Sequence, residues 1–128
     1  MKKAWIVIIY LFSVASFTLA DDVRISGIYS NLYYHEEAGD LIGEEIMIIP
    51  SKEGYSALVQ IAEGGAPYAA LVPVSIKGLK IEFTLPRDGM YSGAKFIGSF
   101  QEGFIVGQFS NGMYGKKVKL KKGKSYWQ

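Results

Sequence analysis

The chain has 128 residues, a formal net charge of +2, no cysteine and a single histidine. This length fits one domain of ordinary size. Without cysteine no disulfide can stabilise that domain. One histidine without cysteine also excludes the usual zinc sites, which take several His or Cys ligands.

The first twenty residues have the order of a secretory signal peptide. Lys2 and Lys3 form a basic start, and the apolar run "AWIVIIYLFSVASF" follows. Small residues up to Ala20 and the acidic pair Asp21-Asp22 come next. This order is typical of a cleaved export signal, and the apolar run is shorter than the ~20 residues of a spanning helix.

We therefore expect residues 1–20 to be a signal peptide, removed after Ala20, with Ala15 as the competing site. The remaining domain, residues 21–128, is expected in the periplasm or outside a bacterial cell. No stable membrane insertion is expected after cleavage, because no other segment is long and apolar enough to span a bilayer.

The charges of the expected domain cancel but are segregated along the chain. Removing Lys2 and Lys3 leaves twelve basic and twelve acidic side chains. Residues 21–63 carry a net charge of −7, residues 64–115 carry +1, and residues 116–128 carry +6. A nucleic-acid-binding domain usually has a net basic balance, so no nucleic-acid partner is expected.

The rest of the chain predicts strands rather than helices. Short runs alternate apolar and polar residues with a period of two, and turn residues separate them. In chain order the expected strands cover residues 22–34, 41–50, 55–63, 69–76, 79–85, 94–100, 104–109 and 116–122.

About eight short strands joined by short turns predict an all-β domain in which neighbours pair antiparallel as a meander. In a domain of this size such a meander fits a small closed barrel best, with a β-sandwich as the alternative. Closure would also remove exposed strand edges. Pro73, inside an expected strand, indicates a bulge or an unpaired edge at that point.

An eight-stranded barrel is just wide enough to be filled by side chains or to hold one small ligand. We expect a mostly filled interior, and a pocket at one mouth stays open as an alternative. The glycines inside strands, Gly27, Gly43, Gly98 and Gly107, indicate bends or close backbone approach. The residues expected to point inward are Phe83, Phe96, Phe100, Phe104, Val106, Val118 and Leu120.

The basic end "KKVKLKKGKSYWQ" is expected to be the last barrel strand rather than a tail. Its lysines alternate with Val118 and Leu120, as in a half-buried strand with lysines facing solvent. We expect this strand to pair with the first one. Tyr126 and Trp127 would be buried there and lock the closure.

Carboxylates are the most informative polar residues. Glu44 and Glu45 are adjacent, so they point to opposite faces of a strand, and one of them faces an apolar interior. Glu63 shares a face with Val59 and Ile61 near a strand end. Glu45 and Glu63 are read either as polar anchors for a ligand or as structural salt-bridge residues, with the C-terminal lysines as partners.

Tyrosines supply candidate contact residues. Tyr33 and Tyr34 lie next to the polar stretch "HEEAGD", where amphipathic rings suit an interface. His35 in that stretch reads as a surface loop residue, because no serine lies in a nucleophile elbow. We therefore assign no catalytic residue, no metal site and no cofactor.

The eight-strand meander, with glycine-containing strands such as "FIGSF" and "FIVGQF", resembles small calycin-type barrels, the lipocalin and avidin group. The stretches "SGIYSN", "GDLIGEE" and "GKSYWQ" are also similar to small exported bacterial proteins. The lipocalin G-x-W signature is replaced by "SGIYSN", so no ligand set is carried over from that group.

These observations predict an exported, non-enzymatic binding module. It would hold a small apolar ligand at the barrel mouth, or an extracytoplasmic protein through tyrosine-rich loops. The expected contact residues are Tyr33, Tyr34, Glu45, Glu63 and Trp127. The alternatives are a hydrolase that uses Glu44 or Glu45 with Glu63 or Asp40, a hydrolase inhibitor, and a structural protein of the cell envelope.

Overall fold

The computed structural model describes residues 25–111 and 115–128, and its regular elements are strands. The expected signal peptide and its cleavage sites lie outside these residues. The strands are β1 (Gly27–Ser30), β2 (Tyr33–His35), β3 (Asp40–Ser51), β4 (Gly54–Gly64), β5 (Tyr68–Lys77), β6 (Lys80–Thr84), β7 (Lys95–Gln101), β8 (Phe104–Ser110) and β9 (Lys117–Gly123).

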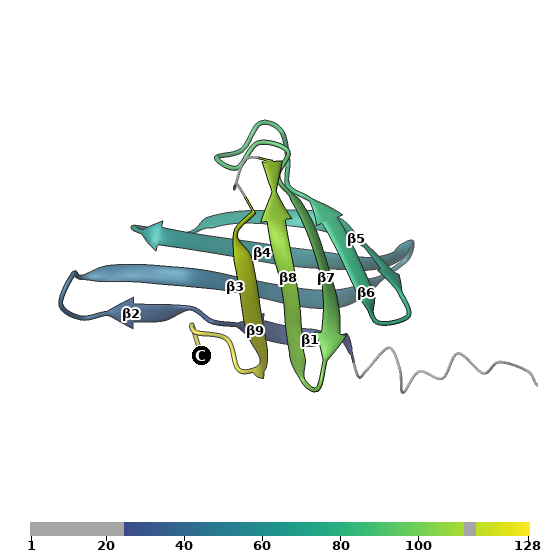
Figure 1. Cartoon of the computed structure of the whole chain (residues 1–128), viewed down its shortest axis with the longest axis horizontal. Coiled ribbons are helices and arrows are strands. Elements are labelled where there is room, and N and C mark those ends of the chain that lie inside the picture. The colour runs from purple at the N-terminus through teal and green to yellow at the C-terminus, as the bar shows by residue number, and fades with distance from the viewer. Residues whose placement is uncertain (1–24, 112–114) are drawn as a thin grey trace, which may run out of the picture.

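Eight of these strands close a barrel, and β2 lies outside it. The strands pair antiparallel in the order β1-β9-β8-β7-β6-β5-β4-β3-β2, and β1 also pairs with β3. β1 therefore joins the last strand to the third and completes the barrel (Figure 1). The prediction of an antiparallel meander that closes into a barrel is confirmed.

β1 and β2 together correspond to the first expected strand, and they keep one register against β3 across a gap at Asn31 and Leu32. At the gap, the side-chain Oδ1 of Asn31 accepts a hydrogen bond of 2.6 Å from the backbone N–H of Glu44. The backbone N–H of Asn31 donates to the carbonyl of Glu44 at 2.9 Å. A side-chain amide thus replaces a main-chain carbonyl in the ladder.

Side chains from all eight barrel strands fill the middle of the barrel. Phe83, Phe96 and Phe109 pack around one another with ring centroids 4.9 to 6.0 Å apart. Burying each such ring contributes roughly 1.5–3 kcal/mol. The expected filled interior is therefore present around this cluster. The fully buried side chains include Ile46, Ile48, Val59, Ile61, Ile81, Leu85, Phe96, Ile105, Phe109 and Leu120.

Two of the residues expected inside point outward instead. On β8 the inward side chains are Ile105 and Phe109, which are fully buried. Phe104 and Val106 alternate with them and therefore face solvent, where Phe104 lies under the ammonium group of Lys119. The pairing of Phe100 with Ile105 sets this register, and the turn before Phe104 carries no sequence sign of it.

Gly98 and Gly107 make room for Phe96. They are paired residues of β7 and β8, and the Phe96 ring lies against both. A Cβ on Gly98 would lie 2.8 Å from Phe96 Cε1, and a Cβ on Gly107 would meet Phe96 Cζ more closely still. The close backbone approach expected at these glycines is confirmed.

The basic C-terminal stretch forms the closing strand, as predicted. β9 pairs with β8 and, through Lys121, Lys122 and Gly123, with β1. Val118 and Leu120 are buried, whereas the alternating lysines of this strand are exposed. The lysines therefore lie on the outer surface, and the apolar residues close the barrel.

Pro73 lies where β5 lacks one neighbour. β5 pairs with β6 only at Ser75, Ile76 and Lys77. In the part of the chain that the structure describes, residues 68–74 therefore pair with β4 alone. A proline on such an edge loses no ladder hydrogen bond on its free side. The unpaired edge position predicted for Pro73 is confirmed.

Candidate functional site

Two adjacent buried carboxylates mark the start of β3. Glu44 is 1% exposed and Glu45 is 4% exposed, although both are acidic. Glu44 shares the inward face with Ile46 and Ile48, so Glu45 points outward. The predicted opposition of the two carboxylates is confirmed, and each has a different set of partners.

Glu45 holds the C-terminal residues against the outside of the barrel. One carboxylate oxygen accepts a hydrogen bond of 2.6 Å from the Ser125 hydroxyl, and the other accepts one of 2.9 Å from the backbone N–H of Tyr126. Bonds to a charged acceptor are stronger than neutral ones. Glu45 is buried because this turn covers it, and it does not face the interior.

We call these two hydrogen bonds, which join Glu45 to Ser125 and Tyr126, the clamp. Trp127 lies on the outer surface next to it. Its indole Nε1–H donates a hydrogen bond of 2.8 Å to Gln60 Oε1 on β4, and its ring meets that of Tyr126 edge-on, with centroids 5.0 Å apart. Trp127 is 54% exposed and Tyr126 is 38% exposed. The expected burial of these two rings is therefore wrong, because the chain leaves the ladder after Gly123 and folds back over the outside.

The clamp stands beside an outward surface without exposed charge, which we call the uncharged wall. Its central row crosses three strands, since Met47 pairs with Leu58 and Leu58 pairs with Leu71. Leu71 is 67% exposed. The wall comprises the outward residues Met47, Ile49, Ser56, Leu58, Gln60, Ala69, Leu71 and Pro73, together with Tyr126 and Trp127.

Tyr33 and Tyr34 lie on β2, outside the barrel, and both are about half exposed. Tyr34 pairs with Leu41, four residues before Glu45 on the same face of β3. At about 3.3 Å per residue this places Tyr34 roughly 13 Å from the clamp. The structure thus brings Glu45 and Trp127 to one surface and leaves Tyr34 at its far end, whereas Tyr33 pairs with Ile42 and points to the opposite face.

Glu63 and Glu44 lie on the inward faces of β4 and β3, at one mouth of the barrel. Lys116 forms an ion pair with Glu44 and lies 3.9 Å from Glu63. The contact with Glu44 does not meet hydrogen-bond geometry, so Glu44 Oε1 is a buried oxygen held by charge attraction alone. A structural ion pair with a C-terminal lysine is one of the two interpretations of Glu63 from the sequence, and the contact between Lys116 and Glu63 agrees with it.

Tyr91 reaches the same cluster from the loop between β6 and β7. Burial, followed by the charge of Glu63 and a hydrogen bond to it, raises the pKa of Tyr91 to about 12. Tyr68 packs edge-on against it, with ring centroids 5.4 Å apart. Two carboxylates therefore meet at one mouth, as a carboxylate hydrolase would need, but a lysine lies between them and neutralises part of their charge.

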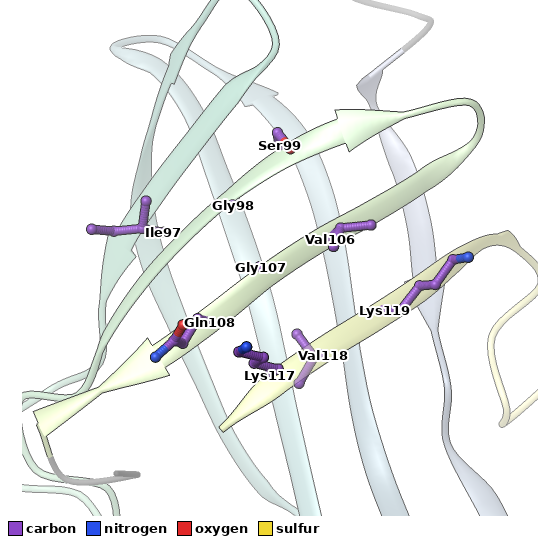
Figure 2. Close-up of a pocket in the computed structure, with 9 residues that line it drawn as sticks. All are labelled: Ile97, Gly98, Ser99, Val106, Gly107, Gln108, Lys117, Val118 and Lys119. Atoms are coloured by element: carbon purple, nitrogen blue, oxygen red, sulfur yellow. The ribbon is translucent and has the colours of Figure 1, made fainter. Parts of the chain in front are cut away.

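A groove lies on the outer surface of the barrel over β7, β8 and β9, on the side opposite the uncharged wall (Figure 2). Its volume is about 640 Å³. It runs over the backbone of the paired residues Gly98 and Gly107, at which an added side chain would point inward toward Phe96, and Lys117 and Lys119 stand along one side. The residues of this lysine groove are Ile97, Gly98, Ser99, Val106, Gly107, Gln108, Lys117, Val118 and Lys119.

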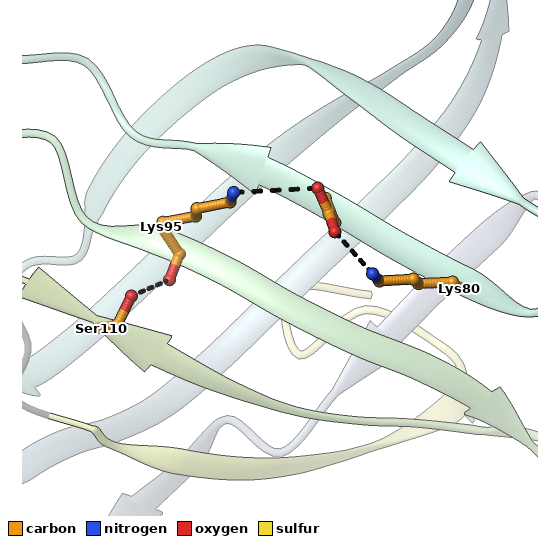
Figure 3. A network of polar contacts seen from close by, with 4 residues as sticks. Lys80, Lys95 and Ser110 are labelled. Carbon is orange, nitrogen blue, oxygen red and sulfur yellow. Dashed lines mark hydrogen bonds and ion pairs between the residues drawn. The ribbon is translucent and has the colours of Figure 1, made fainter.

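The lysines next to the groove on β6 and β7 are already paired. Glu82 contacts Lys80 at 2.9 Å and Lys95 at 3.9 Å, and the Ser110 hydroxyl donates to the Lys95 carbonyl (Figure 3). Hydrogen bonding and charge attraction from Lys80 lower the pKa of Glu82. Lys117 and Lys119 have no ion pair among the described residues, and the ammonium group of Lys119 lies over the Phe104 ring.

Sequence reasoning missed Leu58, Leu71 and Tyr91, and it did not single out Lys116 among the C-terminal lysines. The strand "AALVPVSI" is apolar on both faces, which is the one signal that an outward apolar surface existed. The contacts of Lys116 and Tyr91 depend on long-range pairing that no local pattern reports.

Within residues 25–111 and 115–128, no cluster of three metal-binding side chains occurs, and no helix there has the length and hydropathy to cross a membrane. Comparison with known proteins finds no family model, no curated protein and no solved structure that matches the chain.

Proposed function

We propose that this chain is an exported, non-enzymatic binding module that takes a protein partner on its uncharged wall. The single observation that carries the proposal is the outward row Met47–Leu58–Leu71, in which Leu58 and Leu71 are exposed, with Trp127 fixed beside it. A contiguous exposed apolar surface on a small soluble domain is typical of an interaction site.

The composition of the wall supports a protein partner. Interface cores are depleted of charged residues and enriched in Trp, Tyr and Met. The wall has one acidic residue at its border, Glu45, and that carboxylate is covered by the C-terminal turn. Apolar side chains could therefore be desolvated there without the cost of burying an unpaired charge.

The wall is also held in one arrangement before binding. Leu58 and Leu71 lie on paired strands, and Trp127 is fixed by its bond to Gln60 while Glu45 holds the preceding turn. A rigid aromatic anchor loses little conformational entropy on binding. Trp127 and Glu45, both expected as contact residues from the sequence, have roles in this surface as anchor and as positioning residue.

The filled interior favours this mode over a ligand held deep in the barrel. Phe83, Phe96 and Phe109 occupy the space that a hollow barrel would offer. A small amphipathic ligand would have to bind at the mouth, near Glu44, Glu63 and Lys116. We include in the proposal a kinship with calycin-type barrels, supported by eight antiparallel strands that close. Export is supported by the N-terminal sequence.

Native mass spectrometry of the chain, purified from the periplasm or culture medium of its own source, tests the proposal. We expect a retained protein partner. Leu71→Asp should release it, because a charge would enter the desolvated centre of the interface. Leu79→Asp is the matched control, since Leu79 is 66% exposed against 67% for Leu71 but lies in the turn between β5 and β6.

Partner retention that is equal in both variants would contradict the proposal. A retained small mass, lost on Glu63→Gln but not on Leu71→Asp, would instead favour the ligand at the mouth. Circular dichroism of each variant checks that the barrel is folded.

A further inference from the structure

The lysine groove and the tip of the β2–β3 hairpin are complementary surfaces that do not meet within one molecule. The hairpin extends from one side of the barrel, away from β7, β8 and β9 (Figure 1). We propose that the hairpin tip of one copy binds in the lysine groove of another, so that the chain associates head to tail. This surface is independent of the uncharged wall.

The groove offers positive charge next to an apolar floor. Lys117, Lys119 and Lys121 follow one face of β9 at a spacing of about 6.6 Å, set by every second residue of a strand. All three are exposed and have no ion pair among the described residues. Ile97, which is 43% exposed, and Val106 provide the apolar part.

The hairpin tip offers the opposite charge next to aromatic rings. Glu36 and Glu37 are exposed and have no ion pair in the part of the chain that is described. Tyr33 and Tyr34 precede them, with 50% and 53% of their surface exposed. Carboxylates can therefore reach the lysine row while a ring covers the apolar floor.

The hairpin tip is preorganised for this contact. Gly39 donates its backbone N–H to the carbonyl of His35 at 2.9 Å, and Ala38 donates to His35 Nδ1 at 3.2 Å. Both bonds close the turn before any partner binds. A turn that is already ordered loses less entropy on binding than a free loop.

Charge complementarity favours a second copy over an unrelated acidic protein as the occupant. The segment 21–63 has a net charge of −7 and the segment 116–128 has +6, and among the described residues Glu36, Glu37, Lys117 and Lys119 belong to no ion pair. Because the contact joins two different surfaces, each copy keeps one free hairpin and one free groove. Such heterologous contacts give rings or open chains.

Sedimentation velocity of the purified chain tests the proposal. Association should grow with protein concentration at roughly 0.01 M salt, where charges act over ~30 Å, and disappear at roughly 1 M salt, where they act over ~3 Å. Glu36→Gln with Glu37→Gln removes the acidic tip, and Lys117→Gln with Lys119→Gln removes the lysine row. Each double variant should associate about tenfold more weakly than the unmodified chain.

Mixing the two double variants separates this geometry from others. One variant keeps its groove and the other keeps its hairpin, so an equimolar mixture should form dimers and nothing larger. The control is Glu53→Gln with Glu102→Gln, which removes two exposed carboxylates elsewhere and should leave association unchanged.

Three results would overturn the proposal. They are a chain that stays monomeric at low salt, a double variant that associates as strongly as the unmodified chain, and a mixture that behaves like its separate components. Leu71→Asp keeps this association if it runs through the groove, so its loss in that variant would also overturn the proposal and place self-association on the uncharged wall.

Discussion

The two outer walls of the barrel contrast sharply although they cover one interior. Over β3, β4 and β5 the outward positions hold Met47, Leu58 and Leu71, whereas over β9 they hold Lys117 and Lys119. Behind both walls apolar side chains fill the middle of the barrel, and the inward carboxylates Glu44 and Glu63 lie at one mouth. Packing of the interior therefore restricts the residue types at inward positions. The outward positions are free of this restriction, and their residue types differ with what each wall contacts.

The largest effect should come from the interior that both walls share. Phe96→Ala removes the ring that packs against Phe83, Phe109 and the two strand glycines, so it should lower the free energy of unfolding by about 3–5 kcal/mol. Leu58→Ala, on the uncharged wall, should cost under about 1 kcal/mol because Leu58 is 37% exposed. Urea denaturation measures both, and equal losses would mean that the wall is part of the core.

The second-largest effect should come from alkaline pH, which should lower the free energy of unfolding. Burial raises the pKa of Tyr29 to about 12, and burial with Glu63 raises that of Tyr91 to about 12, against 10.0 when unfolded. Stability is therefore fully present below pH 10 and is lost as pH rises toward 12, by on the order of 2 kcal/mol for each ring.

Tyr91→Phe should reduce this loss of stability at alkaline pH. It should leave the dependence of stability on pH unchanged on the acid side. Tyr34→Phe, at an exposed ring, is the control variant. Unfolding by urea at a series of pH values measures the loss, and identical alkaline slopes for Tyr91→Phe and the unmodified chain would contradict the assignment.

Glu45→Ala should have a smaller effect, confined to the uncharged wall. Its two hydrogen bonds hold the turn at Ser125 and Tyr126, and the released turn can be solvated by water. The cost should therefore be about 1 kcal/mol, with a rise in solvent exposure of Trp127. Tryptophan fluorescence reports the second effect directly, because Trp127 is the one tryptophan of the described residues.

Deleting residues 126–128 should accordingly leave the barrel folded, contrary to the expectation from burial of Tyr126 and Trp127. Loss of the barrel's far-ultraviolet circular dichroism in the truncated chain would restore that expectation. Retention of the signal, with weaker partner binding, would support an external anchor.

The smallest effect on stability should be that of Leu71→Asp. Its side chain is mostly in water, so the unfolding free energy should change by less than about 0.5 kcal/mol. Solubility should rise because an exposed apolar residue is removed. A large loss of stability, read from the urea midpoint, would show that Leu71 packs against something in the free protein.

The fold was largely predictable, and the site was not. Alternation over "KKVKLKK" identified β9 because its two faces differ in polarity. The strand "AALVPVSI" is apolar on both faces, so parity alone could not tell that Leu71 faces solvent. Trp127 was misplaced because residues after Gly123 follow no ladder, and apolarity alone does not state which side of the wall a ring takes.

The polar contacts show the same limit. Glu44 and Glu45 could be assigned to opposite faces from their adjacency. Which of them meets Lys116 depends on the closure of β9 against β1, a contact between distant parts of the chain. Local pattern therefore gave the alternatives, and topology chose between them.

The pairing of β1 with β9 has a mechanical consequence. Ile28 lies opposite Gly123, so the beginning of the first strand and the end of the last one are neighbours at the same end of the barrel. A force that pulls these ends apart acts along the antiparallel hydrogen bonds and loads them one after another. The barrel should therefore open like a zipper at its seam, under tension far below that needed to slide its strands past each other.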